Sequence, residues 1–237
     1  YIREAKLQGM TTSIVSNGTK MTQEWLTKMR PHLDWLGLSI DASNDKLHVE
    51  MGRGLKGELT LGCSKHLDRC LRVLEIAIPL DYGIKLNTVV NRVNLHDDMT
   101  DLIALIEPDR WKVFQVLPIQ GENDGRVEPL LISDSEFDEY VNRHREALAP
   151  LGIEVVAETN EQMLGTYAMI DPLGYAYTNQ NGRYLYSKQS IVEVGFADAW
   201  AQVSEGFSES GFEDRGGEWD WSEPFSTGYR LPISDEG

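Results

Sequence analysis

The sequence predicts an α/β protein built from parallel βα units. Four short apolar or β-branched runs alternate with segments of helical periodicity, and the fourth run, residues 111–119 (WKVFQVLPI), is apolar almost throughout. Strands with continuous apolar character are typical of a parallel sheet covered on both faces. The regular alternation favours βα units over separate blocks of helices and strands.

The first half of the chain supplies three of these units. Apolar residues at 2, 5, 7 and 10 indicate the end of an amphipathic helix, and a strand at 12–15 and a turn at 16–19 follow. A helix then begins near Thr22, and residues 36–40 form a short buried strand that ends at Asp41. A glycine-bearing loop at 51–54 precedes a long helix whose apolar positions run from Leu67 to Ile78.

The remaining elements are a strand at 84–90, a helix at 99–106 and the strand at 111–119. After Pro118 the pattern changes to a loop at 121–125, a helix at 133–148 and a short strand at 152–156. The end of the chain is acidic and rich in Trp and Gly, and we interpret it as a surface wrap.

Composition and length describe an ordinary globular chain. The 237 residues are 41% hydrophobic and 25% charged, which excludes global disorder. No run approaches the roughly 18 apolar residues of a membrane helix, and the start of the chain does not resemble a signal peptide. We therefore expect a cytoplasmic protein without a membrane segment. Because the chain opens on Tyr1, we also expect it to be part of a longer protein.

The net charge of −16 lies entirely in the second half of the chain. Residues 1–112 balance 15 basic against 15 acidic residues, whereas residues 113–237 carry 7 basic and 23 acidic residues. Nucleic-acid binding depends on clustered Lys and Arg, so nucleic acid is not an expected partner. A small anion bound in a local basic pocket remains compatible with this distribution.

Neither cysteine nor histidine forms a metal-binding pattern. Cys63 and Cys70 are seven residues apart, which predicts free thiols on one face of a helix. The five histidines show no paired metal spacing, and surface or capping roles are favoured for them. The sequence therefore predicts no metal site.

Charged residues inside two strands give the clearest functional signal. Lys85 and Asn87 share one face of their strand by the period-two rule, and Arg110 and Lys112 share a face of the next. Buried lysines need an anionic partner, either an internal carboxylate or a phosphorylated or carboxylated ligand. The chain has one further Lys after Lys112, namely Lys188, and this scarcity favours the ligand. Arg53, between two glycines, is placed either to bind an anion or as a solvated loop residue.

Several segments together resemble viperin-like radical S-adenosylmethionine enzymes in order and spacing. They are SIVSNGT at 13–19, LSID at 38–41, GRG at 52–54, KLNTVVNR at 85–92, RWKVFQ at 110–115, GEN at 121–123, SIVEVG at 190–195 and RGG at 215–217. The resemblance extends to about residue 221. It implies a partial (βα)6 TIM-like barrel of the radical S-adenosylmethionine type, with barrel strands three to six in residues 1–120 and a C-terminal extension in residues 121–237 that covers the barrel mouth.

The resemblance also implies an activity. Such enzymes reductively cleave S-adenosylmethionine at a [4Fe-4S] cluster, and the resulting radical abstracts the ribose 4′ hydrogen of a nucleoside triphosphate. Loss of water then gives the 3′-deoxy-3′,4′-didehydro nucleotide, an antiviral chain terminator. CTP is the family's usual substrate, and UTP is the other option that we keep open.

Site residues follow from the resemblance position by position. Asn17, Ser39 and Arg53 are expected to contact S-adenosylmethionine. The nucleotide is expected to contact Lys85, Asn87, Arg110, Lys112 and Arg183. Tyr167 corresponds to a tyrosine that returns a hydrogen atom or an electron after the abstraction, although packing on the barrel mouth explains it equally well.

The sequence departs from the family in two respects, because the C-x-x-x-C-x-x-C loop that holds the cluster and the glycine-rich G-G-E-P segment are both absent from it. The cluster ligands are therefore expected upstream of Tyr1. The alternative is a cluster-less α/β module that binds nucleotides or a partner without catalysis. An iron–sulfur delivery protein is a candidate partner for the acidic tail.

Overall fold

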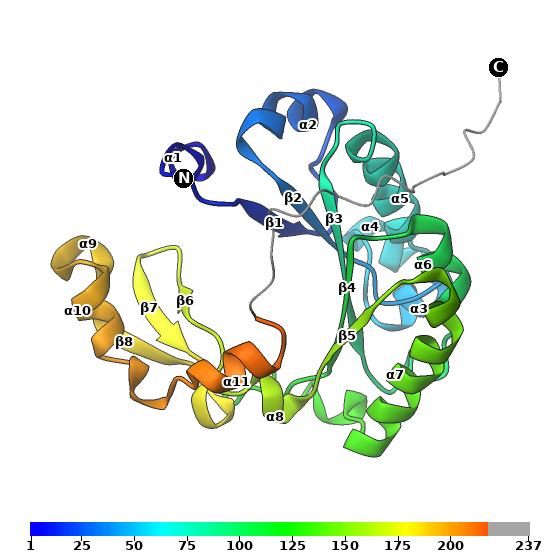
Figure 1. The fold of residues 1–237 in the computed structure, drawn as a ribbon. Coiled ribbons are helices and arrows are strands. Elements are labelled where there is room, and N and C mark those ends of the chain that lie inside the picture. The colour runs from blue at the N-terminus through cyan, green and yellow to red at the C-terminus, as the bar shows by residue number, and fades with distance from the viewer. Residues whose placement is uncertain (218–237) are drawn as a thin grey trace.

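The structure, a computed structural model, describes residues 1–217. Within this range five parallel strands form one sheet in the order β1-β2-β3-β4-β5 (Figure 1). The strands are β1 Ser13–Ser16, β2 Trp35–Ser39, β3 Gly83–Val90, β4 Arg110–Gln115 and β5 Val155–Glu158. Sequential order with parallel pairing requires a crossover after each strand, so the sheet is a succession of βα units.

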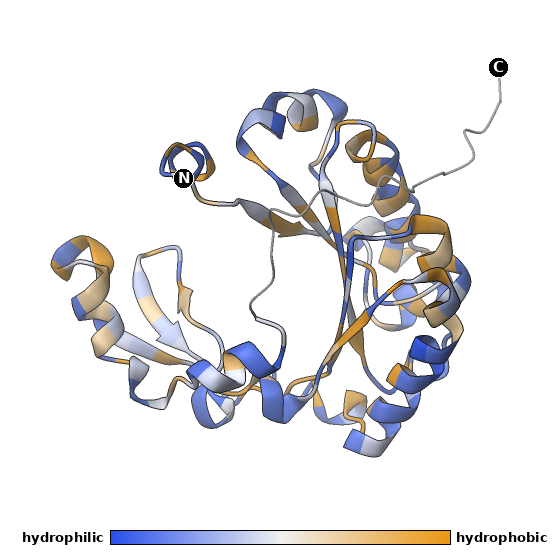
Figure 2. Ribbon diagram, viewed as in Figure 1, coloured by the Kyte–Doolittle hydropathy of each residue, from blue (hydrophilic) through white to orange (hydrophobic). Residues whose placement is uncertain are grey.

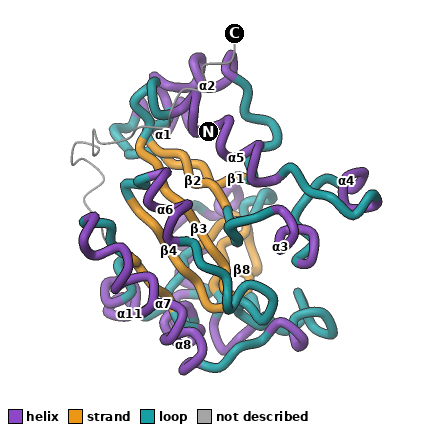
Figure 3. Tube along the Cα trace, turned by 90° about the vertical axis from the view of Figure 1, so that its right-hand side faces the viewer, coloured by secondary structure: helices purple, strands orange, loops and turns teal. Residues whose placement is uncertain are grey.

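Helices cover the outer face of this sheet. Figures 1 and 3 show α2, α5, α6 and α7 on one side of the strands, and the inner face carries no such helical layer. The helices up to this point are α1 Ile2–Leu7, α2 Gln23–Met29, α3 Asp45–Glu50, α4 Lys56–Thr60, α5 His66–Ala77, α6 Thr100–Ile106 and α7 Asp134–Leu148. Short 3-10 turns occupy Arg30–His32, Glu128–Leu130 and Ala149–Leu151.

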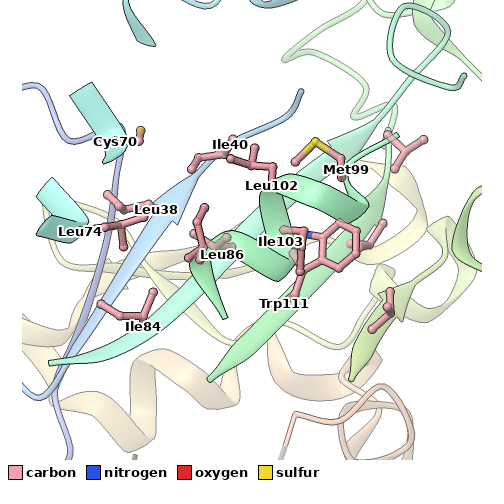
Figure 4. Packing of buried hydrophobic residues seen from close by; sticks show 14 of the residues in the cluster. Leu38, Ile40, Cys70, Leu74, Ile84, Leu86, Met99, Leu102, Ile103 and Trp111 are labelled. Carbon is pink, nitrogen blue, oxygen red and sulfur yellow. The ribbon is translucent and has the colours of Figure 1, made fainter. Parts of the chain in front are cut away.

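The hydrophobic core lies between the sheet and these helices. Leu38 and Leu86 point from β2 and β3 toward α5 and α6, where Leu74 and Ile103 meet them (Figure 4). Trp111 is fully buried in this layer, and its indole N–H donates to Oγ1 of Thr88 over 2.9 Å. In Figure 2 the solvent side of α7 is mostly blue, while β5 is orange. The alternation along each strand therefore sends apolar side chains outward to the helices and leaves the other face for polar ones.

A small antiparallel sheet with its own helices follows β5. Its strands are β6 Met169–Ile170, β7 Tyr175–Thr178 and β8 Leu185–Ser190, and its buried Ala176 packs with Ala199 of α10. The helices of this part are α8 Asn160–Met163, α9 Ile191–Val194, α10 Phe196–Ala201 and α11 Glu209–Asp214, with 3-10 turns at Gln180–Gly182 and Ser204–Gly206. In Figure 1 these elements lie on the side of the inner face of the large sheet.

The main elements agree with the prediction, and the parallel sheet is larger than predicted. The strand expected at 152–156 forms as β5 and pairs in parallel with β4, so residues 1–217 hold five parallel strands rather than four. The sheet therefore continues beyond residue 120, and the division of the chain at that residue stays a prediction. Helices α3 and α4, on either side of the glycine loop, were also not predicted. Residues 218–237, the larger part of the expected acidic wrap, lie outside the described residues.

The predictions for cysteine and histidine need correction. Cys63 precedes α5 and is exposed, whereas Cys70 lies inside α5 and is buried, so the two thiols do not share a helix face. His48, His66 and His144 are buried rather than on the surface. His144, for example, donates from Nδ1 to the carbonyl of Tyr140 over 2.8 Å and accepts at Nε2 from a backbone N–H. Neutral imidazole satisfies both neighbours, which periodicity alone does not reveal.

We predict that Leu86→Ala lowers the free energy of unfolding by about 2–5 kcal/mol, because the fully buried side chain leaves a cavity between sheet and helices. The matched control is Leu61→Ala, whose side chain is exposed and whose effect should stay within about 0.5 kcal/mol. Urea unfolding followed by circular dichroism measures both. Equal effects of the two variants would contradict the assigned core.

Candidate functional site

The inner face of the sheet carries two adjacent rows of three residues, and five of these six are predicted site residues. The register aligns Gly37, Lys85 and Arg110 in one row, and Ser39, Asn87 and Lys112 in the next. Side chains two residues apart in a strand share a face, so both rows point to the side away from the helical layer. Tertiary structure thus brings more than half of the predicted site residues together on three neighbouring strands.

Asn87 lies at the centre of these rows with an unsatisfied side chain. Its Oδ1 atom is buried and accepts no hydrogen bond from the described residues. A buried acceptor without a partner costs about 1–3 kcal/mol. This amide therefore fits a position where a bound molecule donates a hydrogen bond.

Lys112 has an internal carboxylate partner. Its ammonium group contacts Oε1 of Glu158, at the end of β5, and both side chains are buried. The same oxygen accepts from Nη1 of Arg215 over 3.1 Å, while Oε2 accepts from the hydroxyl of Tyr167 over 2.5 Å. Lys112 therefore has an internal carboxylate partner, and its contact with a ligand stays a prediction.

Four cations lie close together in this cluster. Lys85, Arg110, Lys112 and Arg215 influence one another electrostatically; among residues 1–217, Glu158 contacts Lys112 and Arg215, and Glu154 acts on Arg110. Burial together with the charges of Arg110 and Arg215 lowers the pKa of Lys85 to about 8. Burial and the charge of Lys85 likewise lower the pKa of Lys112. An anion with several charges bound here would relieve this repulsion.

Arg110 also anchors the end of the described chain. Its Nη2 donates to the carbonyl of Gly216 over 2.6 Å. Gly216 has a φ of +70°, and a Cβ atom there would lie 3.1 Å from the same guanidinium nitrogen. Glycine therefore allows the backbone to approach this arginine closely.

A cavity of about 180 Å³ opens beside the strand ends and is lined by Asn17, Thr19, Gly52, Arg53, Gly54, Leu55, His66 and Arg69. Asp41 fixes Arg53 here, since its Oδ2 accepts from Nε over 2.5 Å and its Oδ1 accepts from the backbone N–H of Val89 over 2.9 Å. His66 connects the cavity to the strand rows by donating from Nε2 to the carbonyl of Ser39 over 2.7 Å. Arg53 is thus an oriented cation at a cavity, and its binding of an anion stays a prediction.

The contacts of Asn17 and Arg183 do not by themselves indicate a ligand. Asn17 lines the cavity, but its Oδ1 accepts from the backbone N–H of Thr19 over 3.1 Å and so also forms a local turn. Arg183 is exposed, and its backbone pairs with Gln120 just after β4. No contact within residues 1–217 joins its side chain to the cation cluster, so a phosphate contact by Arg183 stays a prediction.

Sequence reasoning missed Glu158, Arg215 and Asp41 as site residues. Glu158 follows a short apolar run, and assigning that run to the parallel sheet would have placed this carboxylate at a strand end. Asp41 and Arg215 lie within the segments that carried the family resemblance, but nothing in their spacing indicated a partner. Their contacts span 12 to 57 residues, which only the folded chain defines.

Two absences apply to the described residues. Among residues 1–217 no group of three or more His, Cys, Asp or Glu side chains is arranged to hold a metal ion. No helix in that range has both the length and the apolar character needed to cross a membrane.

Comparison with solved structures defines the class of fold. The chain matches the structure titled "Native anSMEcpe with bound AdoMet and Kp18Cys peptide" with a TM-score of 0.55 and 13% identity, covering 71% of this chain and 50% of the other. The structure titled "Native anSMEcpe with bound AdoMet" gives a TM-score of 0.54 at 12% identity, covering 84% and 60%. The fold is therefore the partial TIM-like barrel of radical S-adenosylmethionine enzymes. No protein-family model matches the chain.

Sequence comparison defines the family. The chain is 40% identical over 222 residues to the S-adenosylmethionine-dependent nucleotide dehydratase of Flammeovirga pacifica, covering 93% of this chain and 71% of that protein. It is 36% identical to the enzyme of the same name from Lacinutrix mariniflava and 35% identical to RSAD2 of Siniperca chuatsi, spanning 44% and 58% of their lengths. The chain belongs to the family of S-adenosylmethionine-dependent nucleotide dehydratases, or viperin family, and spans only part of each of these relatives.

We predict that the affinity of the chain for inorganic triphosphate falls between pH 7 and pH 9. Lys85, with its pKa lowered to about 8, is charged below that pH and loses its charge above it. Isothermal titration calorimetry at pH 7, 8 and 9 measures the change. A Lys85→Arg variant keeps its charge at pH 9 and should lose less affinity. Parallel losses in both proteins would show that another group titrates.

Proposed function

We propose that the intact protein is a radical S-adenosylmethionine dehydratase that converts a nucleoside triphosphate, CTP or UTP, into its 3′-deoxy-3′,4′-didehydro form with an antiviral role. Membership of the nucleotide dehydratase family supports the reaction class. The observation that carries the proposal for this chain is the clustering of four cations, three of them buried and Lys85 partly buried, near the unsatisfied Oδ1 of Asn87 on the inner face of the sheet.

The substrate side of the proposal rests on the two strand rows. Lys85, Arg110 and Lys112 would pair with triphosphate oxygens, because charged donors on neighbouring strands match several closely spaced anionic oxygens. Asn87, between them, would accept a hydrogen bond from the nucleotide.

The cofactor side rests on the cavity at the strand ends. Its volume of about 180 Å³ is below the roughly 300–1,000 Å³ of pockets that enclose a whole small molecule, so it fits one end of S-adenosylmethionine. Arg53, held by Asp41, would bind the carboxylate of that end, with Asn17 and Ser39 as further contacts. When bound, and cleaved by one electron from a reductant, S-adenosylmethionine would supply the radical that removes the ribose 4′ hydrogen.

The described residues do not fit an iron–sulfur cluster. Such a centre needs several closely spaced thiolates. Cys63 and Cys70 are the two cysteines of the chain, one exposed and one inside the core, and burial raises the pKa of the Cys70 thiol to about 12. A thiol with that pKa stays protonated and is a poor ligand.

Tyr167 is proposed to return a hydrogen atom or an electron to the substrate after the abstraction. Its hydroxyl donates to the buried Glu158, and Lys112 contacts the same carboxylate. The phenol is thus two contacts away from Lys112, one of the proposed phosphate-binding side chains. Burial also raises the pKa of Tyr167, so the phenol keeps its proton at neutral pH.

The partner protein and the location in the cell stay predictions. The acidic tail expected to dock an iron–sulfur delivery protein extends through residues 218–237, outside the described residues. A cytoplasmic location also stays a prediction.

We predict that Lys85→Ala and Lys112→Ala each weaken binding of CTP and UTP by at least about 10–100-fold, because a hydrogen bond to a charged group contributes about 1.5–3 kcal/mol. Lys188→Ala, which removes an exposed lysine of β8, should bind both nucleotides as the wild type does. Equilibrium dialysis of the three variants measures the affinities. Unchanged affinity in both inner-face variants would contradict the assigned nucleotide site.

Activity is tested on the intact protein, after its mass and N-terminal sequence have been determined. With S-adenosylmethionine, a reductant and either CTP or UTP, mass spectrometry should detect a nucleotide lighter by one water together with 5′-deoxyadenosine. Tyr167→Phe should still form 5′-deoxyadenosine but lose most of the dehydrated nucleotide. A mass equal to that of the 237 residues, with nucleotide binding and no product, would instead support the cluster-less binding module.

A further inference from the structure

Glu158 divides its two carboxylate oxygens between different kinds of partner. Its side chain is completely buried at the end of β5. Oε1 contacts the ammonium group of Lys112 and accepts from Arg215 over 3.1 Å, whereas Oε2 accepts from the hydroxyl of Tyr167 over 2.5 Å. One oxygen therefore faces two cations, and the other holds the phenol.

Arg215 holds the ring of the same tyrosine. The guanidinium carbon of Arg215 lies 4.0 Å from the ring centroid of Tyr167, and its Nη2 donates to the carbonyl of Thr166 over 2.9 Å. The side chain of Arg215 is 5% exposed, so this contact is shielded from water. Tyr167 is therefore fixed at its hydroxyl by Glu158, which pairs with two cations of the cluster, and at its face by Arg215, which is one of those cations.

The strength of the bond between Glu158 and Tyr167 depends on the cations. A carboxylate neutralised by two nearby cations attracts a proton donor less strongly than one that faces fewer positive charges. The phosphate groups of the proposed substrate would share Lys112 and Arg215 with Glu158. An anion at this place thus leaves more of the carboxylate's charge for the phenol.

We propose that Glu158 is a positioning residue that fixes the Tyr167 hydroxyl and makes the strength of that hydrogen bond depend on whether an anion occupies Lys112 and Arg215. The proposal rests on the proposed function, because it assumes a polyphosphate at the cation cluster. By this proposal, binding of the substrate's phosphates strengthens the hydrogen bond that the buried Glu158 accepts from Tyr167.

The test follows Tyr167 by NMR in the full 237-residue chain, labelled with 13C at Cζ of tyrosine. Tyr167→Phe identifies the resonance, and inorganic triphosphate is the probe. In the wild type, saturating triphosphate should shift the Tyr167 signal. In Glu158→Gln the signal of the free chain should already be displaced, and more than half of the response to triphosphate should be lost. Glu139→Gln, an exposed site on α7, should behave as the wild type.

Glu158→Asp covers the case in which the glutamine variant does not fold, since it keeps the buried charge on a shorter side chain. It should bind triphosphate and should also show a displaced Tyr167 signal with a reduced response. A wild-type response in the glutamine variant, or in the aspartate variant if only that one folds, would overturn the role of Glu158 and leave the proposed function intact. Failure of the wild-type chain to bind triphosphate would overturn both.

Discussion

Burying lysine and arginine on the inner face of a parallel sheet costs free energy that anionic partners must offset. In this chain internal partners offset this cost, since Glu158 contacts Lys112 and Arg215 and the carbonyl of Gly216 accepts from Arg110. Burial, together with the charges of Arg110 and Arg215, lowers the pKa of Lys85 to about 8. The proposed nucleotide site, the placement of Tyr167 and the anchoring of residues 215 and 216 all involve these cations.

The apolar outer layer allows such a charged inner face to exist. Leu38, Leu86 and Trp111 pack against the helices and fix the strands, so that the alternate residues have defined positions on the other side. Hydrogen bonds at the strand ends also hold the strands and the adjoining loop in place. Asp41 joins the end of β2 to β3 through Val89 and to the glycine loop through Arg53, which holds the cavity wall in place. A preorganised cation loses little entropy when it binds its ligand.

Much of the barrel and part of the site were predictable from the sequence. The period of two in residues 84–90 correctly placed Lys85 and Asn87 on one face, and the register confirms that they lie beside Arg110 and Lys112. The sequence predicted the fifth strand but not its place in the parallel sheet, because a run of four residues does not indicate which strand it pairs with. The burial of His48 and His66 was missed because their pattern has no distinctive spacing.

The sequence by itself determined the class of fold, the face on which each strand residue lies and the family to which the chain belongs, since periodicity and motif order are local properties. Only the tertiary structure decided the partners: Glu158 for Lys112 and Tyr167, Asp41 for Arg53, and Gly216 for Arg110. These contacts join residues up to 106 positions apart. Their energies depend on burial and on the sum of nearby charges, and neither quantity exists until the chain has folded.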